Sequence, residues 1–160
     1  MKESIFQTEF KKNLEMQGFL IYKFYDIPGN RFTLQKPFDF IAIKNGKYFA
    51  FELKQIKSWK KITKKDFIRG KELKNDEIKN NWLLCNQAQN LDAVELNGGS
   101  SFIVINIRIN SPRVNEVVFI EWQQAKRILN NNELTKDYLL NLIACGLSSS
   151  MKKGMFDIKI

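Results

Sequence analysis

The sequence predicts a single α/β domain in which helices flank a mixed central β-sheet. Its 160 residues suit one domain with a substantial core. The hydrophobic fraction of 44% lies in the range of ordinary globular proteins. Helical and strand-like patterns follow one another in the order αβββαββα, which favours helices packed on a sheet. We expect one domain over residues 1–160, with a core at about 4–145 and a loop or mobile tail at 147–160.

Two neighbouring strands form the centre of this prediction. Residues 38–43 and 48–53 are almost continuously apolar, and Asn45–Gly46 between them favours a tight hairpin turn. Strands of this composition are typical of sheet positions that are covered on both faces. We therefore expect the hairpin to lie in the interior of the sheet.

The other elements follow from hydrophobic spacing and from turn residues. Apolar side chains from Ser4 to Gly18 follow the helical repeat, and the aromatic run 19–25 is typical of a strand. Further strands are expected at 102–109 and 116–122, further helices at 76–96, 123–129 and 134–144, and a loop at 28–30.

The chain is strongly basic, with 26 Lys and Arg against 17 Asp and Glu, a formal net charge of +9. A surplus of this size favours a polyanionic partner, nucleic acid first and an anionic membrane surface second. No apolar stretch approaches the ~18 residues of a membrane span, so no span is expected. Of the two kinds of partner we expect DNA and no membrane. The start of the chain lacks the apolar core of a signal peptide, and we expect a cytoplasmic protein.

Much of the surplus lies in a basic segment at residues 57–80, which holds nine basic and four acidic residues. It begins three residues after Lys54, next to the central hairpin. We expect its first cations to contact DNA phosphates, which would position DNA without reading its sequence. These candidates are Lys57, Lys60, Lys61, Lys64, Lys65 and Arg69.

The absence of histidine excludes several kinds of catalytic site. Ser-His-Asp and Cys-His catalysis both need an imidazole, as do the histidine-dependent nucleases. Cys85 and Cys145 are too far apart in sequence to suggest a zinc site. Catalysis in this chain would therefore depend on carboxylates, lysine, tyrosine, hydroxyl groups or a bound metal ion.

Two carboxylates stand where the pattern calls for buried apolar residues. Asp39 lies between two phenylalanines, and Glu52 lies between Phe51 and Leu53. An ionised carboxylate in a central strand is costly unless it is paired or holds a cation. Lys54 follows Glu52 by two residues and so leaves the same face of the strand. These residues predict a site for Mg²⁺, with Mn²⁺ able to substitute, held by Asp39, Glu52 and the Leu53 carbonyl.

At these positions the sequence resembles the PD-(D/E)xK nuclease superfamily. Pro37–Asp39 matches its first motif and Glu52–Lys54 its second. Within it, Gly46–Lys54 is similar to the glutamate strand of RecU-type Holliday junction resolvases. A second similar stretch runs from Asn86–Gln87 through Gly98–Gly99 to the strand 102–105.

The resemblance implies a restriction-endonuclease-like core and a Mg²⁺-dependent homodimer that cuts four-way DNA junctions. It implies that Asp39 and Glu52 bind the metal and that Lys54 is the catalytic lysine. Gln87 would be an active-site glutamine carried on a helix, with Gln89 as the nearby alternative. Members of the superfamily often carry a glutamate on the first helix, and Glu9 is the candidate for this further metal ligand.

The chain departs from the resolvase pattern at several positions. Asn86 stands where those resolvases usually carry histidine, Pro37 replaces a frequent hydroxyl residue, and the insert between Lys54 and Gln87 is longer. Junction specificity therefore stays open beside a restriction-like or phage nuclease with another DNA substrate. Two non-catalytic alternatives also stay open: a nucleic-acid-binding module on a degenerate nuclease fold, and a basic interaction protein with structural ion pairs.

Overall fold

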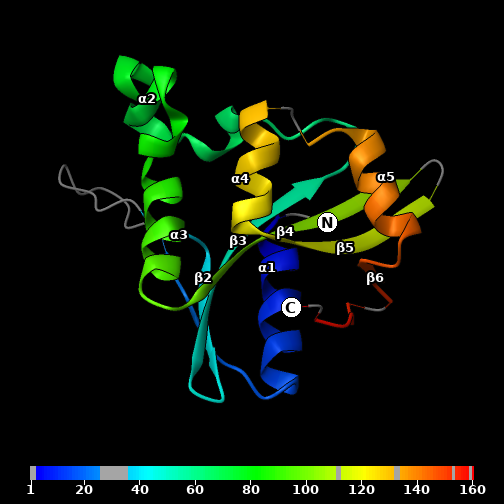
Figure 1. Ribbon diagram of the computed structural model, residues 1–160. Helices are drawn as coiled ribbons and strands as arrows, with labels where there is room; N and C mark the ends of the chain where they lie inside the picture. Colours follow the sequence, from blue (N-terminus) through cyan, green and yellow to red (C-terminus); the bar gives the residue numbers. More distant parts are fainter. Residues whose placement is uncertain (1–2, 26–35, 111–112, 132–133, 153, 159) are drawn as a thin grey trace.

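The computed structural model describes residues 3–25, 36–110, 113–131, 134–152, 154–158 and 160 (Figure 1). A single six-stranded sheet runs through it. The strands, which lie side by side in chain order, are β1 (Leu20–Lys23), β2 (Phe40–Lys44), β3 (Lys47–Ile56), β4 (Ser100–Asn110), β5 (Arg113–Glu121) and β6 (Ser148–Ser150). Strands β3 and β4 pair in parallel, and the other neighbours pair antiparallel. The predicted mixed sheet is confirmed. The loop expected at 28–30 lies outside the described residues.

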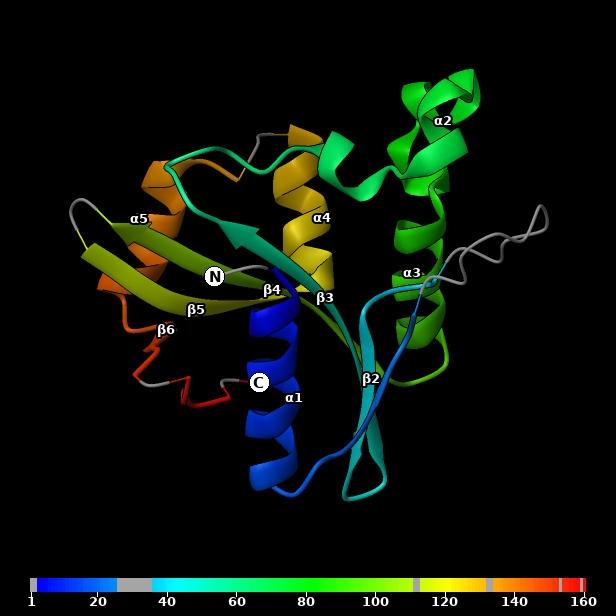
Figure 2. The ribbon, with the colours of Figure 1, turned by 180° about the vertical axis from the view of Figure 1, so that it is seen from behind.

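Helices cover both faces of the sheet. Helix α1 (Glu3–Met16) packs on one face, and α3 (Asn86–Leu96), α4 (Trp122–Asn131) and α5 (Lys136–Ala144) pack on the other (Figures 1 and 2). The α1 face is built on aromatic contacts, such as the edge-to-face packing of Phe10 on Phe51 at 5.2 Å. On the opposite face, Trp122 packs edge-to-face on Trp82 at 5.8 Å. Each face thus has its own aromatic core.

Strand β3 divides its side chains between these two cores. Phe51 and Leu53 are fully buried on the α1 face, whereas Ala50 and Ile56 belong to the core on the α3 and α4 face. Because side chains alternate along a strand, Glu52 leaves β3 on the same face as Ala50. The interior position expected for this hairpin is confirmed.

The single helix predicted over residues 76–96 is wrong, because the chain breaks into three pieces. It forms α2 (Asp76–Asn80), the 3-10 turn η3 (Trp82–Leu84) and then α3. Asn81 is extended, and its side chain accepts a hydrogen bond from the Leu83 amide. Asparagine side chains compete in this way with helical hydrogen bonds. The break turns Trp82 into the core, where it is 4% exposed.

The chain end also differs from the loop or mobile tail expected at 147–160. Ser148–Ser150 pair with β5 as strand β6. Beyond it, Met151 and Phe156 are buried in the α1-face core, and Asn13 on α1 accepts a hydrogen bond from the Phe156 amide at 3.0 Å. This polar stretch joins the sheet through backbone hydrogen bonds to β5. Its serine-rich composition gives no indication of a strand.

The Gly98–Gly99 turn joins α3 to β4 and fits closely against the central hairpin. A Cβ atom on Gly99 would lie 2.5 Å from the Tyr48 ring and 2.7 Å from Val94. We expect Gly99→Ala to lower the free energy of unfolding by about 1–3 kcal/mol, because the neighbours would have to move. Chemical denaturation measures the loss. In a Tyr48→Ala background the loss should shrink, and an equal loss in both backgrounds would contradict the contact.

Candidate active site

The structure brings Asp39 and Glu52 together in the interior of the domain. Asp39 lies just before β2, where its backbone amide donates to the Phe51 carbonyl at 3.1 Å. Its Oδ2 accepts a hydrogen bond from the Leu53 amide at 2.8 Å, beside Glu52 in the same strand. Neither carboxylate has exposed surface. The hairpin register thus places two buried carboxylates next to each other.

Three cations surround this carboxylate pair. Lys36 Nζ lies 2.7 Å from Asp39 Oδ1. Lys54 Nζ and Arg69 Nη2 each lie 2.8 Å from Glu52 Oε1. By contrast, Glu52 Oε2 is buried and has no hydrogen-bond partner in the part of the chain that the structure describes. One acceptor of the pair is therefore left for another group.

Burial controls the protonation of Glu52. Loss of solvent raises the pKa of its carboxyl group above the usual value, and the neighbouring Asp39 charge raises it further. Lys54 and Arg69 act against this rise. A carboxylate held between such opposing influences is typical of functional sites, although structural ion pairs show the same pattern.

Arg69 was expected to contact DNA, yet the structure places it on Glu52. It begins the 3-10 turn η2 (Gly70–Lys74) as its N-cap, and its amide donates to Glu72 Oε2 at 3.1 Å. Glu72 Oε1 accepts from the Asn86 amide at 2.6 Å, at the start of α3. Asn86 Nδ2 in turn donates to the Lys36 carbonyl at 3.0 Å. This network ties the basic segment, α3 and the segment that leads into β2 around the carboxylates.

Gln87 lies in the first turn of α3, directly after Asn86. It is 1% exposed, and neither its amide oxygen nor its amide nitrogen has a hydrogen-bond partner among the described residues. A buried amide without partners is costly, so such a group implies a ligand or water in its surroundings. Gln89, the alternative, is exposed. Of the two glutamines, Gln87 is thus the one whose buried amide is available to a ligand or water.

Glu9 does not join the carboxylate pair. It is on α1, which packs on the face of the sheet opposite to Glu52. It lies against Gly154, where an added Cβ would be 2.8 Å from Glu9 Oε1. Partial burial raises the pKa of its carboxyl group, and Arg108 opposes that rise. The expectation that Glu9 completes the metal site is not met, because the helix spacing that suggested it does not fix which face of the sheet the helix covers.

The groups around the carboxylate pair include oxygen ligands of the type that a hard divalent cation prefers. Two carboxylates converge, and one oxygen has no partner. The Leu53 amide faces Asp39, and in a β ladder the N–H and C=O of one residue face the same neighbour, so the Leu53 carbonyl faces this side as well. No group of three or more His, Cys, Asp or Glu side chains able to hold a metal occurs within the described ranges. A metal here would depend on the two carboxylates, a backbone carbonyl and water.

A cavity of about 270 Å³ opens beside Glu52. Its lining includes both cations that contact Glu52, and it extends along the basic segment. The lining residues are Lys54, Gln55, Ile56, Lys60, Lys61, Ile62, Asp66 and Arg69. Four cations against one carboxylate make this cavity suited to an anion such as a phosphate group.

The six predicted DNA contacts divide into groups. Arg69, Lys60 and Lys61 line the cavity beside Glu52. Lys64 and Lys65 line a different cavity, and Lys57 lies exposed just after β3. Five of the six candidates thus line two neighbouring cavities, which share Lys61.

Comparisons with known proteins identify no family for this chain. No protein-family model matches it, and no curated protein has a matching sequence. Among solved structures it is similar to Hjc of Archaeoglobus fulgidus, a Holliday junction resolvase from an archaeal hyperthermophile. The TM-score is 0.46 and the sequence identity 15%, over 75% of this chain and 77% of that chain. A likeness at this level assigns no role to any residue here.

The contact between Arg69 and Glu52 should be measurable as a coupling. We expect Arg69→Met to lower the free energy of unfolding by about 1–2 kcal/mol, because buried Glu52 loses a charged hydrogen bond but keeps Lys54. The effect should nearly vanish in a Glu52→Gln background, as a double-mutant cycle by urea denaturation would show. Arg69→Lys is the matched control that retains the charge. Equal losses in both backgrounds would show that Arg69 acts elsewhere.

Glu52 should also make stability depend on pH. Since its folded-state pKa is raised, the unfolded chain loses this proton at lower pH than the folded chain does. Stability relative to the Glu52→Gln variant should therefore fall as pH rises from about 4.5 through the raised pKa. Unfolding in EDTA between pH 4 and 8 measures the difference between the two proteins. A difference that stays constant or grows in the opposite direction would contradict the assignment.

Proposed function

We propose that this chain is a divalent-metal-dependent nuclease that hydrolyses phosphodiester bonds in DNA. The observation that carries the proposal is the buried pair Asp39 and Glu52, placed beside a cavity lined mainly by cations. Nuclease chemistry needs such a combination, because carboxylates hold a metal while cations hold the phosphate. The basic composition of the chain agrees with a nucleic-acid substrate.

Each side chain has a distinct proposed role. Asp39 and Glu52 would hold Mg²⁺, or Mn²⁺ in its place, with the Leu53 carbonyl as a further ligand. The bound ion would supply Lewis acidity and activate water. Lys54, whose Nζ reaches both Glu52 and the Asp66 carbonyl, would donate to the attacking water or to a phosphoryl oxygen. Arg69 would hold the phosphate with its remaining N–H groups.

Gln87 is proposed to line the same site from α3. Its buried, unpartnered amide can both donate and accept a hydrogen bond. It would orient a water molecule or a phosphate oxygen near the carboxylates. The sequence resemblance to RecU-type resolvases favours a four-way DNA junction as substrate and a homodimer as the active form. Restriction-like cleavage of another DNA substrate is the alternative within the same chemistry.

One observation favours a non-catalytic alternative. Both carboxylates already have cationic partners, as they would in a nucleic-acid-binding module with structural ion pairs. However, a purely structural pair would be expected to satisfy Glu52 Oε2, which is buried without a partner among the described residues. Titration calorimetry with Mn²⁺ separates the two readings, because only the nuclease reading requires binding that Asp39→Asn and Glu52→Gln abolish.

The nuclease proposal predicts strong and selective losses of cleavage. Asp39→Asn, Glu52→Gln and Lys54→Ala should each lower the rate at least about 100-fold, because the first two remove ligands of the proposed metal and the third removes the proposed donor to the water or phosphoryl oxygen. The assay follows a labelled four-way junction, a linear duplex and a single strand with Mg²⁺, with Mn²⁺ and with EDTA. Faster cleavage of the junction than of the duplex would support the resolvase assignment.

Matched controls separate a loss of chemistry from a loss of folding. Glu121→Gln makes the same change at an exposed carboxylate, and Lys47→Ala removes an exposed lysine at the start of β3. Both should cleave at the normal rate. Cleavage that persists unchanged in Glu52→Gln or Lys54→Ala would overturn the assignment of the site.

A further inference from the structure

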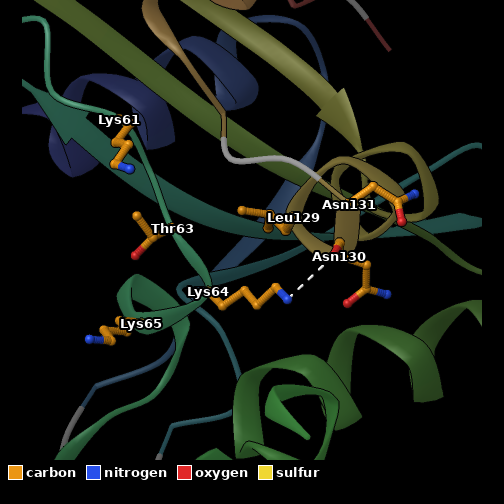
Figure 3. Close-up of a pocket in the computed structure, with 7 residues that line it drawn as sticks. All are labelled: Lys61, Thr63, Lys64, Lys65, Leu129, Asn130 and Asn131. Carbon is orange, nitrogen blue, oxygen red and sulfur yellow. Dashed lines mark hydrogen bonds between the residues drawn. The ribbon is translucent and has the colours of Figure 1, made fainter. Parts of the chain in front are cut away.

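A second, larger cavity lies between the basic segment and the end of α4. Its volume is about 520 Å³. Figure 3 shows its lining side chains, which come from residues 61–65 on one wall and from the last turn of α4 on the other. The lining residues are Lys61, Thr63, Lys64, Lys65, Leu129, Asn130 and Asn131. Three are lysines and none is acidic, so the cavity presents a concentrated positive charge.

Both walls of the cavity are held in place by the fold. The basic wall is anchored where Ile62 and Leu134 exchange two backbone hydrogen bonds of 3.1 Å, and where Phe67 is fully buried. The other wall is anchored by Trp82, whose indole N–H donates to Asn130 Oδ1 at 2.6 Å. Lys64 Nζ reaches across to the Asn130 carbonyl at 3.4 Å, as the dashed line in Figure 3 marks. The cavity is therefore preformed.

The indole contact also determines what Asn130 offers to a ligand. Because Oδ1 accepts the Trp82 N–H, the Asn130 Nδ2 group remains as a hydrogen-bond donor. The Thr63 hydroxyl also lines the cavity, but its hydrogen is donated to Asp66 Oδ2 at 3.2 Å. No carboxylate among the described residues pairs with Lys64 or Lys65. The nearby Asp66 is occupied by the Thr63 amide at 2.7 Å. The lining thus offers the ammonium groups of Lys64 and Lys65 and the Asn130 amide donor, and it contains no acidic residue.

This cavity is continuous in sequence and lining with the one beside Glu52. Lys61 lines both of them. Cations therefore extend from Lys54 and Arg69, past Lys61, to Lys64 and Lys65. A repeating anionic chain would match such a track, whereas a single small anion would use only one of the two cavities.

We propose that the cavity between residues 61–65 and the end of α4 is a second phosphate-binding site for the nucleic-acid backbone. The site would hold the nucleic-acid strand on one side of the phosphodiester bond that is cleaved at Asp39 and Glu52. This part of the inference rests on the proposed function. The lysines contact phosphate oxygens, and the Asn130 amide donates to phosphate or sugar oxygens. Such contacts position a strand and do not read its sequence.

Binding without cleavage tests this site. Fluorescence anisotropy of a labelled single strand, duplex and four-way junction is measured in EDTA across a salt series. The Lys64→Ala/Lys65→Ala double variant should weaken binding about 10-fold and lower the salt slope by about 2. Asn130→Asp should also weaken binding about 10-fold, because it keeps an acceptor for Trp82 but puts negative charge in the cavity.

Three further arms make the outcome decisive. Lys47→Ala and Asn80→Asp, both exposed and outside the cavity, should change binding less than about 2-fold. Unchanged affinity and salt slope in both cavity variants would overturn the proposal. Displacement of the DNA by polyglutamate at the same charge concentration would likewise overturn it, since an acidic protein segment would then be the better occupant.

The same variants separate this inference from the nuclease proposal. If Glu52→Gln still binds DNA in EDTA and loses affinity on Lys64→Ala/Lys65→Ala, the second phosphate site stands whether or not the wild-type protein cleaves. If cleavage requires Glu52 but the cavity variants bind normally, the nuclease proposal stands and the second site is overturned. Thermal denaturation of every variant confirms that it is folded.

Discussion

The buried charge of Glu52 is the constraint on which the rest of the site depends. A carboxylate without exposed surface in a central strand is tolerated only with close cationic partners. Strand β3 supplies one of them, Lys54, two residues away on the same face. The second, Arg69, comes from the basic segment and must reach back to the sheet. The position of that segment is therefore coupled to a charge in the core, together with the burial of Phe67.

Several other features follow from that coupling. With Arg69 fixed on Glu52, Glu72 can accept hydrogen bonds from both the Arg69 and Asn86 amides. These bonds place the first turn of α3, which carries Gln87, next to the Lys36 end of the segment that leads to Asp39. The anchoring of the basic segment also forms one wall of both cation-lined cavities. Groups distant in sequence converge because each link satisfies a polar atom that would otherwise lack a partner.

The sequence predicted the parts of this arrangement that depend on local patterns. Alternation and the Asn45–Gly46 turn determine the hairpin, and the hairpin register places Asp39 beside Glu52. The contact of Arg69 with Glu52 could not be predicted from the sequence. In the basic segment, Arg69 is one of several cations that the local pattern does not distinguish. The ion pair depends on a segment that folds back through 3-10 turns, with no periodic pattern to signal it. Likewise, the face of the sheet that α1 covers separates Glu9 from the pair, and helix spacing alone does not reveal that face.

The charge balance of the site explains why a divalent metal ion and a phosphodiester would bind there together. Lys36, Lys54 and Arg69 already exceed the two carboxylates by one charge. A divalent cation bound alone would add to this excess of positive charge, which is unfavourable in a poorly solvated site. A phosphodiester brings negative charge to the same place, and Arg69 lines the cavity where it would lie. On the proposed function, the cations that neutralise the carboxylates in this structure would turn to the phosphate. The same cations that form structural ion pairs here would then contact the substrate.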